Sequence, residues 1–127
     1  MLADCSQCVG LCCVVPPFDA EQGFGFDKPA ETPCQHLCAD HRCGIHDDLI
    51  ERGFSGCVAF DCLGAGQRLT AQAQARFGST DWRARPDVAR WLMAAYPRVR
   101  RVQEQLATLT LAAMLPGGSS DLAALAQ

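Results

Sequence analysis

The sequence predicts a mainly α-helical protein with little strand, in which an irregular, cysteine-rich lobe precedes an α-helical hairpin or small bundle. Three observations lead to this prediction. All nine cysteines lie at or before Cys62, proline and glycine interrupt the same region repeatedly, and apolar residues recur at helical spacing after Gly66. We expect residues 1–66 to form the lobe and residues 67–127 to form a helical extension that packs on it, the two making one compact domain.

Few regular elements are expected in residues 1–62, because prolines and glycines recur throughout the first third of the chain. Loops should dominate there, with one helical turn near residues 8–13. A short extended piece at residues 42–45 and a helix at His46–Arg52 should follow, since two acidic residues occupy the first turn of that helix and a glycine follows it. Residues 57–62 are expected to be extended.

The first regular helix is predicted after Gly66, where the spacing of the apolar residues changes. Leu69, Ala73 and Phe77 recur at intervals of four, which places them on one helix face. Gly78 follows this pattern and is expected to end the helix, because glycine readily adopts the left-handed conformation found there. This helix is the first arm of the predicted hairpin.

A longer amphipathic helix is predicted to open near Pro86, a residue that suits an early helical position. Pro97 lies within it and should kink or restart it. Its apolar residues are spaced by threes and fours: Val88, Trp91, Leu92, Ala95, Val99, Val102, Leu106, Leu109 and Ala113. Residues 116–118 stop the pattern, and a short helix is expected at Ser119–Gln127. The long apolar stripe makes the C-terminal helices a candidate surface for a homodimer or another protein partner.

Charge is divided unevenly along the chain. Residues 1–62 carry ten acidic and three basic side chains, a net charge of −7, whereas residues 63–127 carry four acidic and eight basic side chains, a net charge of +4. The acidic half makes nucleic acid an unexpected partner. The arginines of the second half are expected to be solvated or to pair with the first half.

No secretory or membrane-spanning pattern is visible. Met1 is followed by neither a basic segment nor an apolar run, and no stretch approaches the length of a membrane span. We therefore expect a cytoplasmic protein without a membrane partner, in a compartment where thiols stay reduced.

The nine cysteines leave three interpretations of the sulfur atoms. A disulfide framework needs an oxidising compartment and leaves one cysteine over, and adjacent Cys12 and Cys13 could form only a strained bridge. If the cysteines were instead inert buried thiols, nothing would explain why they are so densely spaced. Metal ligation explains it best, because the two-residue gap between Cys5 and Cys8 lets one turn aim two sulfurs at one cation. A lobe with so few large aliphatic residues also needs a metal to hold one structure, so we expect it to be metal-nucleated.

The grouping of the cysteines and the identity of the metal stay open at this point. Neighbouring side chains such as Cys12 and Cys13 point apart, so they serve two adjacent metals more naturally than one. Eight thiolates make two tetrahedral sets, which favours two sites or one polynuclear cluster over a single ion. Tetrahedral sulfur suits zinc or an iron–sulfur cluster, and copper(I) is a third candidate. Four side chains are reserve ligands or ordinary surface groups: His36, His41, His46 and Cys38.

Three segments, Cys5–Cys13, Pro33–Leu37 and Cys43–His46, resemble the CxxCxxCC family of zinc- or iron-chelating domains, also called YkgJ-like. The likeness is strongest to the branch found at the N-terminus of bacterial pentapeptide-repeat proteins. That branch carries segments similar to Gly56–Gln67 and Asp81–Arg83. The resemblance is specific over the first half of the chain.

The resemblance implies metal chelation by eight cysteines: Cys5, Cys8, Cys12, Cys13, Cys34, Cys43, Cys57 and Cys62. It does not extend to Cys38, and the pentapeptide repeats are absent, so no function of theirs is transferred. A related cysteine motif in flagellin lysine methylases is associated with an iron–sulfur cluster.

The leading hypothesis of function is a non-catalytic protein that chelates zinc or iron, because eight ligands can close two sites and leave no open position for a substrate. No phosphate-binding loop, zinc-protease helix or serine triad is present in the sequence. The alternatives are an iron–sulfur protein or enzyme component with redox or methyl-transfer chemistry, and a metal storage or sensing protein.

Overall fold

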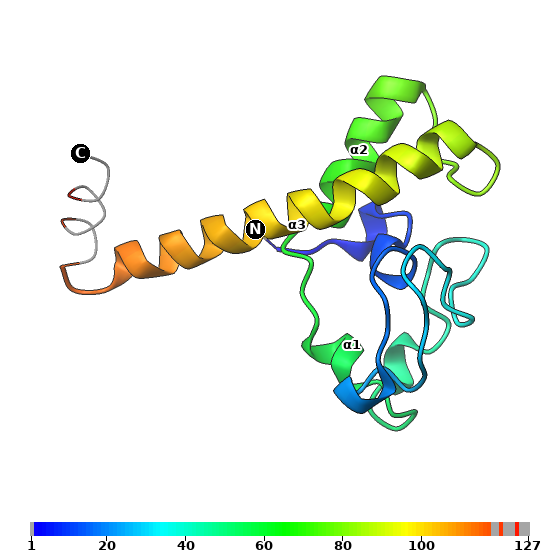
Figure 1. Ribbon diagram of the computed structural model, residues 1–127, viewed down its shortest axis with the longest axis horizontal. Helices are drawn as coiled ribbons and strands as arrows, with labels where there is room; N and C mark the ends of the chain where they lie inside the picture. Colours follow the sequence, from blue (N-terminus) through cyan, green and yellow to red (C-terminus); the bar gives the residue numbers. More distant parts are fainter. Residues whose placement is uncertain (1, 118–119, 121–123, 125–127) are drawn as a thin grey trace.

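The computed structural model describes residues 2–117, 120 and 124, and within them the chain is mainly helical with almost no strand. The fold-class prediction is confirmed to that extent. Figure 1 shows an irregular first half, drawn in blue to green, and a long helix that continues beyond it. The described elements are the 3-10 turns η1 (Cys5–Gln7), η2 (Leu11–Cys13), η3 (Ala20–Gln22) and η4 (His46–Asp48), and the helices α1 (Ser55–Ala59), α2 (Ala65–Phe77) and α3 (Pro86–Met114).

Loops connected by short turns make up the lobe, as expected from its prolines and glycines. The helical turn predicted near residues 8–13 is η2, which follows Gly10 in the left-handed conformation, with φ of 77°. In place of strands, the described residues contain two isolated antiparallel bridges, Phe18 with Lys28 and Leu37 with Cys43. The second bridge lies at the start of the extended piece predicted at residues 42–45.

Two local predictions in the lobe are wrong. The helix expected at His46–Arg52 is only the turn η4, because the chain folds back and the Phe54 N–H donates to the Leu49 carbonyl at 2.7 Å. Residues 57–62, expected to be extended, begin inside the short helix α1. This helix is fixed by a distant contact in which the Gly56 N–H donates to the Gly23 carbonyl at 2.7 Å.

The two helices of the second half occur where the apolar periodicity predicts them. Gly78 ends α2 in the left-handed conformation, with φ of 66°. Pro86 opens α3, which then continues through Pro97 as one helix. It therefore does not restart at this proline, although Pro97 has no N–H to donate to the preceding turn. The short helix predicted at Ser119–Gln127 falls largely on residues outside those the structure describes.

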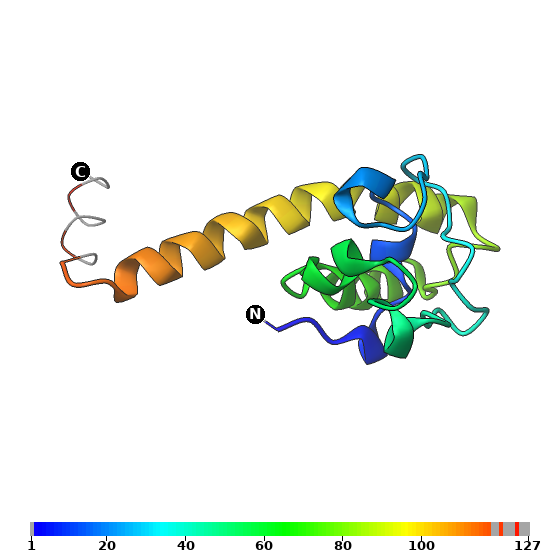
Figure 2. The same ribbon diagram turned by 90° about the horizontal axis from the view of Figure 1, so that it is seen from below.

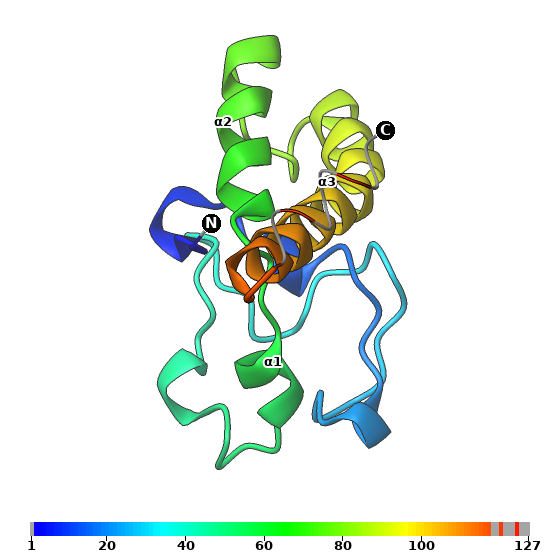
Figure 3. The ribbon, with the colours of Figure 1, turned by 90° about the vertical axis from the view of Figure 1, so that its left-hand side faces the viewer.

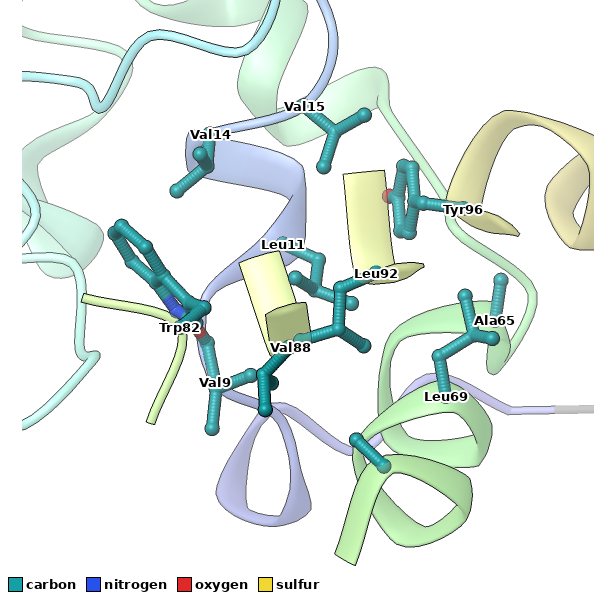
Figure 4. Packing of buried hydrophobic residues seen from close by; sticks show 11 residues of the cluster. Val9, Leu11, Val14, Val15, Ala65, Leu69, Trp82, Val88, Leu92 and Tyr96 are labelled. Atoms are coloured by element: carbon teal, nitrogen blue, oxygen red, sulfur yellow. The ribbon is translucent and has the colours of Figure 1, made fainter. Parts of the chain in front are cut away.

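The main hydrophobic core joins the start of the chain to both long helices. Figure 3, a view along α3, shows α2 on one side of α3 and the lobe on the other. Figure 4 shows the side chains that meet there. The core cluster consists of Val9, Leu11, Val14, Val15, Ala65, Leu69, Ala73, Trp82, Val88, Leu92 and Tyr96, with Cys8 and Cys62 packed against it.

Only the first half of α3 is covered by this core. Val88, Leu92 and Tyr96 are buried, whereas apolar residues of the second half are exposed, as at Val102 and Leu106. Figure 2 shows this half extending away from the rest of the described chain. The prediction that it binds a second copy or another protein is not tested by the fold. No helix among residues 2–117, including α3, is long and apolar enough to cross a membrane.

Candidate metal centre

Seven of the eight cysteines predicted as ligands line a single cavity of about 590 Å³ in the lobe. They come from segments far apart in the sequence: Cys5, Cys12, Cys13, Cys34, Cys43, Cys57 and Cys62. All nine cysteines of the chain lie within the described residues, and each is a free thiol. The sulfur atoms are therefore available to a cation rather than bonded to one another.

Backbone hydrogen bonds bring these segments together. The Cys34 N–H donates to the Cys13 carbonyl at 2.8 Å, which places the segment that carries Cys34 beside η2. The Gly44 N–H donates to the His36 carbonyl at 2.8 Å and holds Cys43 next to the same loop. These hydrogen bonds join main-chain atoms. The cysteine segments are therefore brought together without disulfide bonds between them.

Cys8 is the one predicted ligand outside the cavity lining. Its sulfur packs against Gly66, where an added Cβ would lie 2.6 Å from the Cys8 Sγ and 3.9 Å from the Cys62 Sγ. Glycine at this position therefore lets the two sulfurs approach the same point on α2. All eight predicted cysteines lie in or beside one region of the lobe.

Cys12 and Cys13 form the closest sulfur pair for which the structure gives a distance, with 4.0 Å between their Sγ atoms. Hydrogen bonding from the Cys13 thiol holds the pKa of Cys12 below its ordinary value. The same interaction and burial raise the pKa of Cys13. One of the two is therefore the preferred thiolate, and a nearby cation would be needed to ionise both.

Burial disfavours the thiolate at other positions too. It raises the pKa of Cys5, Cys8 and Cys43, and it raises that of Cys57 to about 11. Neighbouring sulfurs add to each of these shifts by like-charge repulsion. These thiols resist ionisation when no cation is near. A bound cation would stabilise their thiolate forms and so lower their pKa values.

The reserve ligands divide between the cavity and the surface. His36 lines the cavity, with its ring 5.5 Å from that of Phe54, and His46 also lines it but is exposed beside Asp47. His41 is not in the lining; its ring lies 5.7 Å from that of Trp82. Cys38 is exposed, outside the lining, and its thiol donates to the His36 carbonyl.

An apolar wall in the same cavity is a feature that the sequence did not reveal. It is built from prolines, aromatic residues and aliphatic residues: Pro16, Pro17, Phe18, Phe24, Ile45, Leu49, Phe54, Val58 and Phe60. Phe18 stacks on Phe24 with ring centroids 5.0 Å apart. The run Phe24-Gly25-Phe26 is the sequence signal that could have indicated this wall. Only glycine fits between the two phenylalanines, because a side chain at Gly25 would collide with the Phe54 ring. The cavity is therefore lined by apolar side chains as well as by thiols.

Lys28, the chain's one lysine, is a second missed residue. Only 5% of it is exposed, and its ammonium group donates to the carbonyls of Val14, Pro16 and Pro29 at 3.2, 2.8 and 3.1 Å. Burial lowers its pKa, and the sulfurs of Cys34 and Cys13 oppose that shift. The ammonium group thus places a positive charge near the sulfur-lined cavity. Its hydrogen bonds to the carbonyls of Val14 and Pro16 also hold the loop after η2 in place.

The sulfurs surround the cavity without forming a preassembled ligand set. Within residues 2–117, 120 and 124, no three His, Cys, Asp or Glu side chains stand in a geometry ready to hold a metal ion. The donor set nevertheless fits a soft cation in its chemistry, because free, poorly ionised thiols face one shared space. The prediction of eight ligands stays a prediction.

Comparison with known proteins finds a relative of undetermined function. An uncharacterized protein named YybG, from Bacillus subtilis (strain 168), is 41% identical over 104 residues. The match covers 82% of this chain and 36% of YybG, so the chain spans about a third of the length of that relative. No family model matches the chain, and no solved structure matches it. The resemblance to the CxxCxxCC family therefore stays a prediction.

Proposed function

We propose that this chain is a non-catalytic metal-binding protein that holds zinc or iron in the sulfur-lined cavity. The observation that carries the proposal is the convergence of seven cysteines, from segments between Cys5 and Cys62, on one space of about 590 Å³. Cys8, packed beside Cys62 at Gly66, completes the proposed set of eight ligands. The resemblance of the cysteine segments to zinc- or iron-chelating domains is consistent with it.

The ligands are expected to act as thiolates. Because burial raises the pKa of several of these thiols, a cation that bound them would release protons and supply the charge that burial withholds. When bound, zinc would serve as a structural cross-link, and iron would add electron-transfer chemistry. The chain's own contribution is to bring the sulfurs together and to surround them in part with apolar side chains. Such thiols persist in a reducing compartment, so we propose that the protein works in the cytoplasm.

The number of sulfurs favours more than one metal ion. One tetrahedral site is complete with four thiolates. Seven cysteines line the cavity, and Cys8 lies beside Cys62 at Gly66. This supports two adjacent sites or one polynuclear cluster, in which Cys12 and Cys13 serve different metals.

Purification of the full chain without oxygen, followed by elemental analysis and an absorption spectrum, tests the proposal. A colourless protein with about two zinc ions per chain identifies two tetrahedral sites. A brown protein with iron and acid-labile sulfide identifies a cluster and raises the redox alternative. Metal content no higher than that of a cysteine-free protein treated in the same way would rule the proposal out.

Two single substitutions make the test specific. Cys57→Ser removes a sulfur from the cavity lining, and we expect it to lower the bound metal. Cys38→Ser removes an exposed sulfur outside the lining and should leave metal content unchanged. Equal loss in the two variants would mean that the cavity does not select among the cysteines.

A further inference from the structure

The second half of α3 exposes an apolar surface that the rest of the described chain leaves uncovered. Val88 and Leu92, in the first half, are fully buried, whereas Val102, Leu106 and Leu109 are 53%, 46% and 50% exposed. Figure 2 shows this half extending away from the remainder of the described chain, which is called the body below. Several large apolar side chains that share one exposed helix mark a surface for another protein element.

The apolar residues of α3 keep a seven-residue period through both halves of the helix. Steps of four and three alternate along Val88, Leu92, Ala95, Val99, Val102, Leu106 and Leu109. This period places the residues on one stripe, of the kind along which two helices coil around each other. The helix α2 packs on the first part of α3, and its Leu69 and Ala73 share a core with Val88 and Leu92. The stripe therefore continues, ready for a second helix, beyond the part that α2 covers.

The side chains that flank the exposed part of the stripe are uncharged. They are Gln103 and Gln105 in one heptad and Thr110 and Ala112 in the next. Flanking charges set the choice of partner in coiled coils, so this surface carries no charge pattern that selects a different protein. Two identical stripes, in contrast, can meet about a two-fold axis without repulsion between their flanks. A second copy of this chain is the occupant that the surface fits.

The distribution of charge along the exposed half favours one relative direction of two copies. Three arginines and one glutamate lie between Arg98 and Glu104, and no charged residue follows up to Gly117. Parallel helices would place each arginine beside its counterpart and would crowd both bodies at the same end. Antiparallel helices place the basic start of one exposed half beside the uncharged end of the other. Like charges are then separated along the pair.

We propose that the second half of α3 pairs with the same segment of a second copy in an antiparallel homodimer. The contact is centred on Val102, Leu106 and Leu109, with Leu106 of one copy against Leu109 of the second copy. The two bodies then lie at opposite ends of the helix pair. This pairing goes beyond the proposed metal binding and does not depend on it, because these residues lie outside the sulfur-lined cavity.

Sedimentation equilibrium of the full chain at several concentrations tests the proposal. A phosphine reductant is present throughout, so that the nine free thiols cannot link copies through disulfides. We expect a reversible dimer. Leu106→Glu places two charges in the centre of each dimer and should raise its dissociation constant by about a hundredfold or more.

Leu111→Glu is the matched control, because it makes the same substitution at a residue that is 67% exposed and points away from the stripe. It should leave the dissociation constant close to that of the wild type. Circular dichroism verifies that both variants stay folded, as expected because neither leucine belongs to the core cluster. Small-angle X-ray scattering gives the orientation, since an antiparallel dimer is elongated with a body at each end.

The proposal is supported if the wild type and Leu111→Glu form elongated dimers while folded Leu106→Glu is monomeric. A wild type that stays monomeric overturns it, as does a dimer that survives Leu106→Glu, because the interface would then lie elsewhere. A dimer that both variants disrupt equally, or one with its two bodies side by side, also overturns it. None of these measurements reports on bound metal, so failure here would leave the proposed function intact.

Discussion

The indole N–H of Trp82 donates a hydrogen bond to the carbonyl of Val9 at 3.0 Å. Trp82 lies in the connection between α2 and α3, and Val9 lies between two of the proposed ligands, Cys8 and Cys12. The two residues are 73 positions apart and both are buried. One side chain of the helical half thereby fixes the main chain that presents sulfur in the lobe.

Trp82→Phe should destabilise the protein, because it leaves the buried Val9 carbonyl without its donor and removes part of a core side chain. An unsatisfied buried group of this kind costs about 1–3 kcal/mol. Urea denaturation of the two proteins gives the difference in unfolding free energy. The matched control is Trp91→Phe, at a partly buried tryptophan beside Phe77. Equal losses at the two positions would show that the hydrogen bond contributes nothing.

Lys28→Met should also destabilise the chain, since three main-chain carbonyls share the ammonium group as their donor. The methionine fills a similar volume, so the loss reports the contacts of the ammonium group, which are the three carbonyls and the Phe18 ring 4.7 Å away, and we expect about 1–3 kcal/mol or more. Thermal or urea unfolding measures it. Arg52→Met, which removes an exposed ion pair with Asp48 at 3.8 Å, serves as the control and should cost under about 1 kcal/mol. If Lys28→Met were as stable as this control, the hydrogen bonds of Lys28 would not stabilise the loop after η2.

The elements that sequence alone could predict are those with a local cause. The interval of four from Leu69 to Phe77 and the stripe that begins at Val88 identify α2 and α3, because each pattern is contained within its own helix. The short helix α1 depends instead on the Gly56 bond to Gly23, over thirty residues away. No periodicity within α1 could have revealed that contact.

The same distinction applies to the candidate site. The resemblance to the CxxCxxCC family named eight cysteines, and seven of them line the cavity, since their chemistry is carried by residue type. The apolar wall around Phe18 and Phe54 and the buried amine of Lys28 were missed, because their roles come from tertiary placement. The length of α3 was predicted, but not that its second half would lack cover from the rest of the described chain, because an apolar stripe does not show which of its residues the core buries.

Gly66→Ala should separate metal binding from folding. Gly66 is the second residue of α2, so alanine there would gain at most the roughly 0.5–1 kcal/mol that it gains over glycine in a helix interior, and its Cβ would lie 2.6 Å from the Cys8 sulfur. In the metal-free chain the thiol can rotate away, so we expect stability close to that of the wild type. In the loaded chain the sulfur is held, so affinity for zinc should fall, as measured by competition with a chelator.

Gln72→Ala, at an exposed position of the same helix, is the control for Gly66→Ala and should leave zinc affinity unchanged. If Gly66→Ala bound zinc as tightly as this control, Cys8 would not bind the metal from its position beside Gly66.

Asp87→Asn should reveal a pH-dependent contribution at the start of α3. Hydrogen bonds from Arg85, at 2.6 and 3.1 Å, hold the pKa of Asp87 below its ordinary value of 3.8. The folded state therefore binds this proton less readily than the unfolded state, and the contribution is present above pH 3.8 and lost as the pH falls through the folded-state pKa. Wild type should be more stable than the variant at pH 7, and the difference should vanish in strong acid. A difference independent of pH would exclude the charge as its cause.

Removal of metal should expose the thiols in a characteristic order. In the loaded protein we expect one readily modified thiol, that of Cys38, because it is exposed and lies outside the cavity lining. After chelation, the remaining thiols should become reactive toward a disulfide reagent as the lobe loosens, while the core shared by η2, α2 and α3 preserves much of the helical circular dichroism. Cys38→Ser identifies the early thiol, since its loaded form should show no rapid reaction. Identical thiol reactivity before and after chelation would mean that the sulfurs were never held by a cation.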